Sequence, residues 1–243
     1  MRVGVYVDAF NLYYGASRVM SGASEPWKWL DVRALAGRFA RWEGAVIKRV
    51  VYCTAEVNDP EDIEQQERQA NYLAALEAHG SADVIERGRF SSWAKEFPMT
   101  LFPVGNKAPI PFYDEHPRMN LPADLPVRHD SNGRVLATVR YREEKGSDVN
   151  VGSHLLIDVL KGDVDAAIVI SNDSDLALPV AEARLHVPTG LLNPSTNPVP
   201  FPLKGMANDG VGSHWWRKIT RSDLVASQLP DPVGAFARPL SWS

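Results

Sequence analysis

Aspartates follow two segments whose pattern predicts buried strands. Asp173 and Asp175 come just after the apolar run 166–170, and Asp8 directly follows the apolar run 3–7. Continuous apolar runs of this length are typical of strands in a parallel sheet that is covered on both faces. Sheets of this kind bind ligands outside the carboxyl ends of their strands. The carboxylates therefore lie where a site is expected.

Asp148 is expected to join them from the start of the helix that precedes strand 166–170. If the strands before Asp8 and Asp173 are neighbours in one parallel sheet, these two side chains converge. Carboxylates brought together without a Lys or Arg between them repel one another. A hard divalent cation, which prefers oxygen ligands, relieves that repulsion. The pattern predicts a Mg²⁺ or Mn²⁺ site at this edge of the sheet.

Each aspartate taken alone also has a simpler interpretation. An Asp after a strand usually caps a helix or forms a turn, and this applies to Asp8. Asp173 and Asp175 at a helix N-terminus would each contribute about 0.3–1 kcal/mol by charge alone. The combination of these positions with Asp148 favours a metal site, and most of that preference depends on the family resemblance given below. The six histidines show no metal-ligand spacing and none is expected to be catalytic.

The elements that must position these residues alternate in type along the chain. Their order is β-α-β-α-β, an irregular stretch, and then α-β-α-β, with strands expected at 2–8, 46–54, 82–85, 164–170 and 189–192. This order predicts an α/β fold with a mostly parallel central sheet and helices on both faces, of the Rossmann-like kind.

One domain is expected for the 243 residues, with its core at about 1–193. The proline-rich stretch at about 91–135 interrupts the alternation and is interpreted as an insertion, either a β-hairpin or a long loop. A C-terminal extension covers about 194–243. Its aromatic and basic run 215–221 suits stacking on single-stranded nucleic acid, but packing of a docked tail is the favoured interpretation.

Composition narrows the class of protein. A hydrophobic fraction of 44% and a charged fraction of 23% are ordinary for a globular protein, and no apolar run reaches the ~18–20 residues of a membrane helix. A membrane partner is therefore not expected. The net charge of −4 argues more strongly against a nucleic-acid-binding module than against an enzyme. Cys53, a lone cysteine in a strand-like run, favours a reducing cytoplasm and a buried core position.

Three motifs resemble those of the NYN domains, a branch of the PIN-like ribonucleases. They are Val7-Asp8-Ala-Phe-Asn11-Leu-Tyr13, Glu144-Lys-Gly-Ser-Asp148-Val and Ser171-Asn-Asp173-Ser-Asp175-Leu. The third departs from the usual pattern, because Asn172 and Leu176 replace Gly and Phe. Neither change removes a carboxylate, and Asn tolerates the left-handed backbone that a turn can require.

The resemblance implies a metal-dependent endoribonuclease in which a cation activates water for attack on a phosphodiester. Asp8, Asp148 and Asp173 would be the primary metal ligands, and Asp175 a direct or water-mediated fourth. The substrate would be RNA, single-stranded or structured, and a homodimer is possible for the fold. Residues expected to position water, phosphate or the RNA backbone are Asn11, Ser171, Arg140, Arg142 and Lys145.

Alternatives stay open at this point. A solvated strand face explains Arg140 and Arg142 as well as an RNA track does, and a surface ion pair explains Lys145 better than a phosphate contact. The same fold without strong catalysis would be an RNA- or protein-binding module. A phosphatase with a nucleophilic Asp is disfavoured, because Phe10 stands where its second Asp is needed. The phosphate loop GxxxxGK[ST] and the dinucleotide motif GxGxxG are absent.

Overall fold

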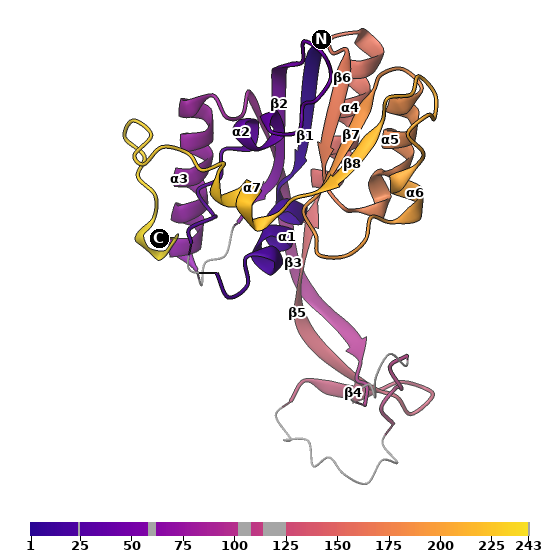
Figure 1. Ribbon diagram of the computed structural model, residues 1–243. Coiled ribbons are helices and arrows are strands. Elements are labelled where there is room, and N and C mark those ends of the chain that lie inside the picture. The colour runs from indigo at the N-terminus through magenta and orange to yellow at the C-terminus, as the bar shows by residue number, and fades with distance from the viewer. Residues whose placement is uncertain (24, 58–61, 102–107, 114–124, 243) are drawn as a thin grey trace. The chain divides into compact units, whose positions relative to one another are not determined.

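A computed structural model describes residues 1–243 except 24, 58–61, 102–107, 114–124 and 243 (Figure 1). The described chain divides into two compact units, Met1–Arg89 with Glu144–Ser243, and Phe90–Glu143. The second unit contains the whole stretch expected as an insertion, about 91–135, and β4 and β5 form an antiparallel pair within it. Whether the chain is best regarded as one domain stays a prediction.

The strands form a mostly parallel sheet, as the sequence predicts. Among the described residues its order is β4-β5-β3-β2-β1-β6-β7-β8. The strands are β1 (Arg2–Asp8), β2 (Val46–Glu56), β3 (Val84–Pro98), β4 (Val127–His129), β5 (Val135–Lys145), β6 (Ala166–Ile170), β7 (Thr189–Asn193) and β8 (Trp215–Lys218). The pairs β1–β2, β2–β3, β1–β6, β6–β7 and β7–β8 are all parallel.

Helices lie on both faces of the first unit's sheet (Figure 1). They are α1 (Ala9–Val19), α2 (Val32–Gly37), α3 (Ile63–His79), α4 (Ser147–Lys161), α5 (Ala177–Arg184), α6 (Phe201–Lys204) and α7 (Arg221–Val225), with short 3-10 helices η1 (Ser174–Leu176) and η2 (Leu240–Trp242). The sequence predicts that Asp59 caps α3 with Pro60 in its first turn, but both residues lie outside the described chain. In the described part, the Asp62 side chain caps the helix. No described helix is long and apolar enough to cross a membrane.

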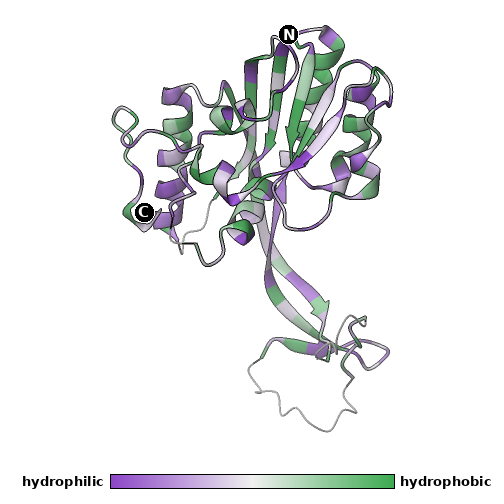
Figure 2. Cartoon of the chain, viewed as in Figure 1, coloured by the Kyte–Doolittle hydropathy of each residue, from purple (hydrophilic) through white to green (hydrophobic). Residues whose placement is uncertain are grey.

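Two hydrophobic clusters, one on each face of the sheet, explain why the central strands are apolar throughout. Side chains alternate along a strand. In β1, Val5 and Val7 belong to the cluster under α1, α2, α3 and α7, whereas Tyr6 belongs to the cluster under α4, α5 and α6. Every residue of β6 is buried. Figure 2 shows the green of hydrophobic residues concentrated on these central strands.

The parallel pairing of β1 with β6 brings two strand ends together. Val7 lies beside Ile170, the last residue of β6, so Asp8 and the residues after Ile170 leave the sheet at the same edge. The chain enters α1 directly after Asp8, which caps that helix by accepting a hydrogen bond from the Asn11 amide. This is the arrangement that the sequence predicts for the site.

Strand β8 was not expected from the sequence. It lies beside β7 in parallel, with Leu191 opposite Trp216, and extends the sheet with residues of the C-terminal extension. The Trp215 ring packs against Trp42, with centroids 5.5 Å apart. The interpretation of the tryptophan-containing run as a docked tail is therefore confirmed. Cys53 is buried, as expected.

The second unit has its own contacts. Arg128 pairs with Glu96, and Val135 and Phe112 are buried. The Lys95 ammonium lies 4.4 Å from the centroid of the Tyr141 ring. Among its described residues, this unit thus combines cation–π contacts and a bidentate ion pair at the surface with a small number of buried apolar side chains.

Candidate metal centre

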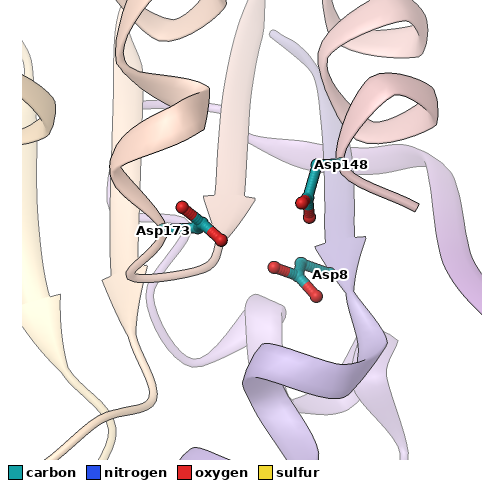
Figure 3. Close-up of side chains that lie close together, drawn as sticks. All are labelled: Asp8, Asp148 and Asp173. Carbon is teal, nitrogen blue, oxygen red and sulfur yellow. The ribbon is translucent and has the colours of Figure 1, made fainter. Parts of the chain in front are cut away.

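Three of the four predicted carboxylates meet at one point. Asp8 at the end of β1, Asp148 in the first turn of α4 and Asp173 after β6 each offer an oxygen, and these oxygens lie within 4.8 Å of one another. Figure 3 shows the three side chains pointing toward a common space. A single cation contacts ligand oxygens at about 2.0–2.6 Å, so oxygens at this mutual spacing can share one ion.

Asp8 is held in place from two sides. Its Oδ1 accepts a hydrogen bond of 3.0 Å from the Asn11 amide, and its Oδ2 accepts one of 2.9 Å from the Ser171 hydroxyl. The same hydroxyl oxygen accepts a 3.0 Å hydrogen bond from the Asp173 amide. Ser171 is fully buried, so it links two of the carboxylate-bearing loops from beneath the site. Asn11 binds the second loop through its side chain, which accepts from the Asn172 amide at 2.9 Å.

Burial and like charge act together on Asp8. The side chain is only 3% exposed, and loss of water raises the pKa of Asp8 to about 7, with further increases from the charges of Asp148 and Asp173. The hydrogen bonds from Asn11 and Ser171 stabilise the charged form and act in the opposite direction. A cation beside Asp8 would favour its charged form and lower this pKa.

Asp148 experiences the same kind of environment to a smaller extent. It is half-buried, and its loss of water raises its pKa to about 6, assisted by the charges of Asp173, Glu144 and Asp175. A close backbone approach positions its helix, because a Cβ on Gly88 would lie 2.5 Å from the carbonyl oxygen of Lys145. Gly146 then begins α4 with a positive φ of 103°, which favours glycine.

Four other predicted site residues are not among the three clustered side chains. Asp175 is exposed and is not among the three clustered residues, although its amide donates to Asp173 Oδ1. Lys145 is exposed at the end of β5. Arg140 and Arg142 belong to the second unit, where Arg140 donates to Ser92 and Arg142 lies 5.2 Å from the centroid of the Phe90 ring.

Two of the aspartates also act as helix caps, as the simpler interpretation predicts. Asp8 caps α1, and Asp173 caps η1 through the Asp175 amide. Capping uses one oxygen of each side chain. The bond to Asn11 therefore leaves Asp8 able to present lone pairs to an ion, and the capping and metal-binding roles are compatible.

A cleft of about 380 Å³ opens over the three carboxylates. Sequence patterns did not single out several residues that line it, among them Glu144, Arg18, Ser195 and Asn197. Glu144 was visible within a motif, but no spacing marked it as facing the site. Ser195 and Asn197 lie in the loop after β7, where the carboxyl ends of parallel strands meet, and that position was the available signal.

A second pocket of about 290 Å³ adjoins this cleft. Phe10 and Tyr14 of α1 line both of them. Tyr13, Tyr72 and Trp242 add further aromatic surface, drawn from α1, α3 and η2. The first unit thus combines an acidic cleft with an aromatic pocket across two shared rings.

Comparison with known proteins shows similarity to an enzyme. The chain is 25% identical over 269 residues to 6-hydroxy-3-succinoylpyridine 3-monooxygenase HspA of Pseudomonas putida, covering 100% of this chain and 75% of that protein. A crystal structure of a protein of unknown function from Vibrio parahaemolyticus is similar over 94% of this chain and 96% of that one, at 14% identity and a TM-score of 0.44. No family model matches the chain, so the resemblance to NYN domains stays a prediction.

These findings confirm one expectation and correct another. The similarity to a named enzyme supports the prediction that the chain is an enzyme. The prediction of an endoribonuclease, with its alternative of an RNA- or protein-binding module, was wrong, because the relative is a monooxygenase. The physical reason is that a carboxylate cluster at a sheet edge specifies a kind of ion, whereas the reaction depends on the rest of the site. RNA as a partner stays a prediction without support.

Proposed function

We propose that this protein is a metal-dependent monooxygenase that hydroxylates a small heteroaromatic molecule. The observation that carries the proposal is the junction of the two pockets. Phe10 and Tyr14 line both the aromatic pocket and the cleft over Asp8, Asp148 and Asp173. A ring seated among the aromatic side chains would have its polar edge directed toward the carboxylates. The relative's named substrate is a hydroxypyridine with a succinoyl side chain, which is a molecule of this kind.

The donor set fits a hard divalent cation. All three clustered side chains offer oxygen, the ligand atom that Mg²⁺ and Mn²⁺ prefer. The raised pKa values of Asp8 and Asp148 reflect repulsion and burial that a cation would relieve. When bound, such a cation polarises a substrate oxygen and lowers the pKa of a ring hydroxyl, which makes the ring richer in electrons.

A dinucleotide seated in the usual way fits the first strand-to-helix turn poorly. That turn requires glycines and a helix N-terminus open to pyrophosphate. Here the turn reads Asp8-Ala-Phe-Asn11, and the Asp8 carboxylate already accepts from the Asn11 amide at the N-terminus of α1. Its charge would repel a pyrophosphate. We therefore assign the reductant to a diffusible two-electron donor rather than to a tightly bound dinucleotide.

The overall reaction balances with that donor. At a ring carbon that carries hydrogen, one C–H bond, O₂, two electrons and two protons give a C–OH bond and water. At a ring carbon that carries an acyl group, the same reactants would insert one oxygen atom into the ring–acyl bond and give an ester and water. Within the chain, Phe10 and Tyr14 would orient the ring and exclude water from one side of it. Glu144 lines the cleft outside the three-carboxylate cluster, and its Oε2 would accept the proton of a substrate hydroxyl.

The test is incorporation of labelled oxygen. Purified protein would be incubated with 6-hydroxy-3-succinoylpyridine, Mn²⁺ or Mg²⁺, a reduced nicotinamide and ¹⁸O₂, and the product analysed by mass spectrometry. One ¹⁸O atom per product molecule is expected, together with equimolar consumption of the reductant. Asp173→Asn should lower the rate at least 100-fold, because it removes a charged ligand.

Asp163→Asn is the matched control. Asp163 is exposed in the loop after α4 and is not one of the residues that line the cleft. This variant should keep the wild-type rate. Absence of ¹⁸O in the product, or an unchanged rate in Asp173→Asn, would refute the proposal.

A further inference from the structure

The aromatic pocket differs from the acidic cleft in its charge. Lys28 and Arg68 are among the residues that line it, and no Asp or Glu is present among its described lining residues. The neighbouring cleft is lined by four carboxylates. In a chain with a net charge of −4, this lining offers two basic side chains and no acid, although Arg68 is at present paired with Glu64 and Asp62, which stand outside the lining. An anionic group would therefore be attracted to this pocket and repelled from the cleft.

The walls of the pocket suit a flat ring. Tyr13 and Tyr14 are 44% and 57% exposed, a large apolar surface to leave in water on a single helix. Tyr72, also in the lining, is buried, and its ring centroid lies 5.8 Å from that of Trp242 at an interplanar angle of 70°. Small-molecule sites are typically concave, lined by aromatic side chains and fitted with a few convergent polar groups. At about 290 Å³ the pocket has the size for one ring and a short side chain.

The two cations can exchange their present partners. Arg68 is bonded to Glu64 at 2.5 Å and lies 4.0 Å from Asp62 Oδ1. The two carboxylate side chains are 76% and 47% exposed, and exposed pairs of this kind contribute little stability. A guanidinium has five N–H donors and prefers planar carboxylates. The Lys28 ammonium lies 5.8 Å from the centroid of the Trp27 ring, a distance at which cation–π attraction is weak.

We infer that this pocket binds an aromatic carboxylate, with its ring between the tyrosines of α1 and Trp242 and its acid group on Arg68 and Lys28. The inference rests on the proposed function in one respect, since it makes this pocket the substrate site of the same enzyme. It adds that the substrate must be an acid. Arg68 and Lys28 then determine specificity, and the carboxylate end points away from the acidic cleft.

The experiment measures binding without catalysis. Isothermal titration of the wild-type protein in EDTA would compare pyridine-3-carboxylate with its neutral amide, which has the same ring. The acid should bind at least tenfold more tightly than the amide. Arg68→Gln and Lys28→Gln should each weaken binding of the acid about tenfold and leave binding of the amide unchanged, because a charge-assisted hydrogen bond is lost.

Two further variants guard against a merely structural effect. Arg68→Lys keeps the charge and should retain part of the preference for the acid. Arg41→Gln makes the same change in net charge at an exposed position outside the pocket, and should bind like wild type. An acid-to-amide ratio that is close to one in wild type, or unchanged in both Arg68→Gln and Lys28→Gln, would overturn the inference.

The outcome is independent of the oxygenation assay. If the acid binds through Arg68 and Lys28 but no hydroxypyridine is oxygenated, the pocket is a site for aromatic acids and the proposed function fails. If oxygenation occurs while the two variants keep the full acid-to-amide ratio, the function stands and this inference fails.

Discussion

Replacing Asp8 with asparagine would separate the proposed metal-binding role of this residue from its effect on the stability of the fold. Asp8 is buried beside two other carboxylates, and its pKa is raised from 3.8 to about 7 by loss of water and by the charges of Asp148 and Asp173. Between about pH 4 and pH 7, the folded protein without metal therefore holds a proton on Asp8 that the unfolded chain releases. We expect Asp8→Asn to stabilise the metal-free protein at alkaline pH while abolishing metal binding.

The sign follows from proton linkage. Between pH 4 and pH 7 the folded state binds more protons at Asp8 than the unfolded state, so the free energy of unfolding falls as pH rises. A shift of about 3 pKa units at about 1.36 kcal/mol per unit is on the order of 4 kcal/mol, all of it lost by about pH 8. Asp148 contributes in the same direction, but its half-exposed position screens the effect.

The asparagine keeps some hydrogen bonds and loses another. Its Oδ1 can still accept from the Asn11 amide, whereas the Ser171 hydroxyl loses its acceptor at the position of Oδ2. Loss of one such bond costs about 1 kcal/mol. The variant should therefore be about 1 kcal/mol less stable than wild type at pH 4 and about 3 kcal/mol more stable at pH 8.

Urea unfolding followed by circular dichroism, in EDTA at pH 4 and pH 8, measures both values. Asp165→Asn is the control, because the pKa of Asp165 is shifted in the opposite direction to that of Asp8. Its ion pair and hydrogen bonds with Arg2 lower its pKa to about 2, and it contributes stability above pH 4 that is lost as pH falls through about 2. Asp165→Asn should destabilise the protein at pH 8. Equal destabilisation by Asp8→Asn at pH 4 and pH 8 would refute the electrostatic account of the site.

Three further predictions concern the carboxylate cluster, a buried hydrogen bond and the packing of β8. At pH 8, Mn²⁺ at about 100 times its Kd should raise the Tm of wild type by roughly 5–10 °C in thermal scans. Asp173→Asn should remove this shift in Tm. Asp175→Asn should keep most of it, because the Asp175 side chain is exposed and is not part of the cluster. Tyr6→Phe should lower the free energy of unfolding by about 1–2 kcal/mol in urea titrations, because the buried hydroxyl donates to a carboxylate of α4 at 3.0 Å. Gly190→Ala should lower it by about 1–3 kcal/mol, since the added methyl group would collide with the Trp215 ring; stability equal to wild type would contradict the packing of β8 on β7.

The site was predictable to the extent that it depends on local pattern. Apolar runs fixed strands β1 and β6, and parallel pairing places the residues after them at one edge. Asp8 and Asp173 converge for that reason, and Asp148 joins them because α4 begins near the same edge. Asp175 was assigned as a direct or water-mediated fourth ligand from the family resemblance. Its side chain is exposed on η1, and that role stays a prediction.

Other parts depend on contacts between distant segments, which a single sequence does not reveal. Strand β8 has four residues with a mixed aromatic and basic pattern, and only its pairing with β7 makes it a strand. The aromatic pocket combines residues from near the two ends of the chain, with Tyr13 on α1 and Trp242 on η2. Each of these aromatic residues, taken alone, resembles an ordinary packing residue.

The two pockets also show why the expected reaction was wrong while the expected ion remains a sound proposal. A phosphodiester backbone carries a negative charge on every nucleotide and needs cations along its path. Among the described residues lining the cleft, Arg18 is the one cation beside four carboxylates, so the protein surface there would repel such a chain. The cations Lys28 and Arg68 lie instead among aromatic rings, in a space of about 290 Å³ that suits one small ring. On the proposed function, the carboxylates would select the ion and the adjoining pocket would select the substrate. If Arg68 and Lys28 prove essential for the acid but not for its amide, the class of substrate will have been determined by the pocket rather than by the motif that first drew attention to the site.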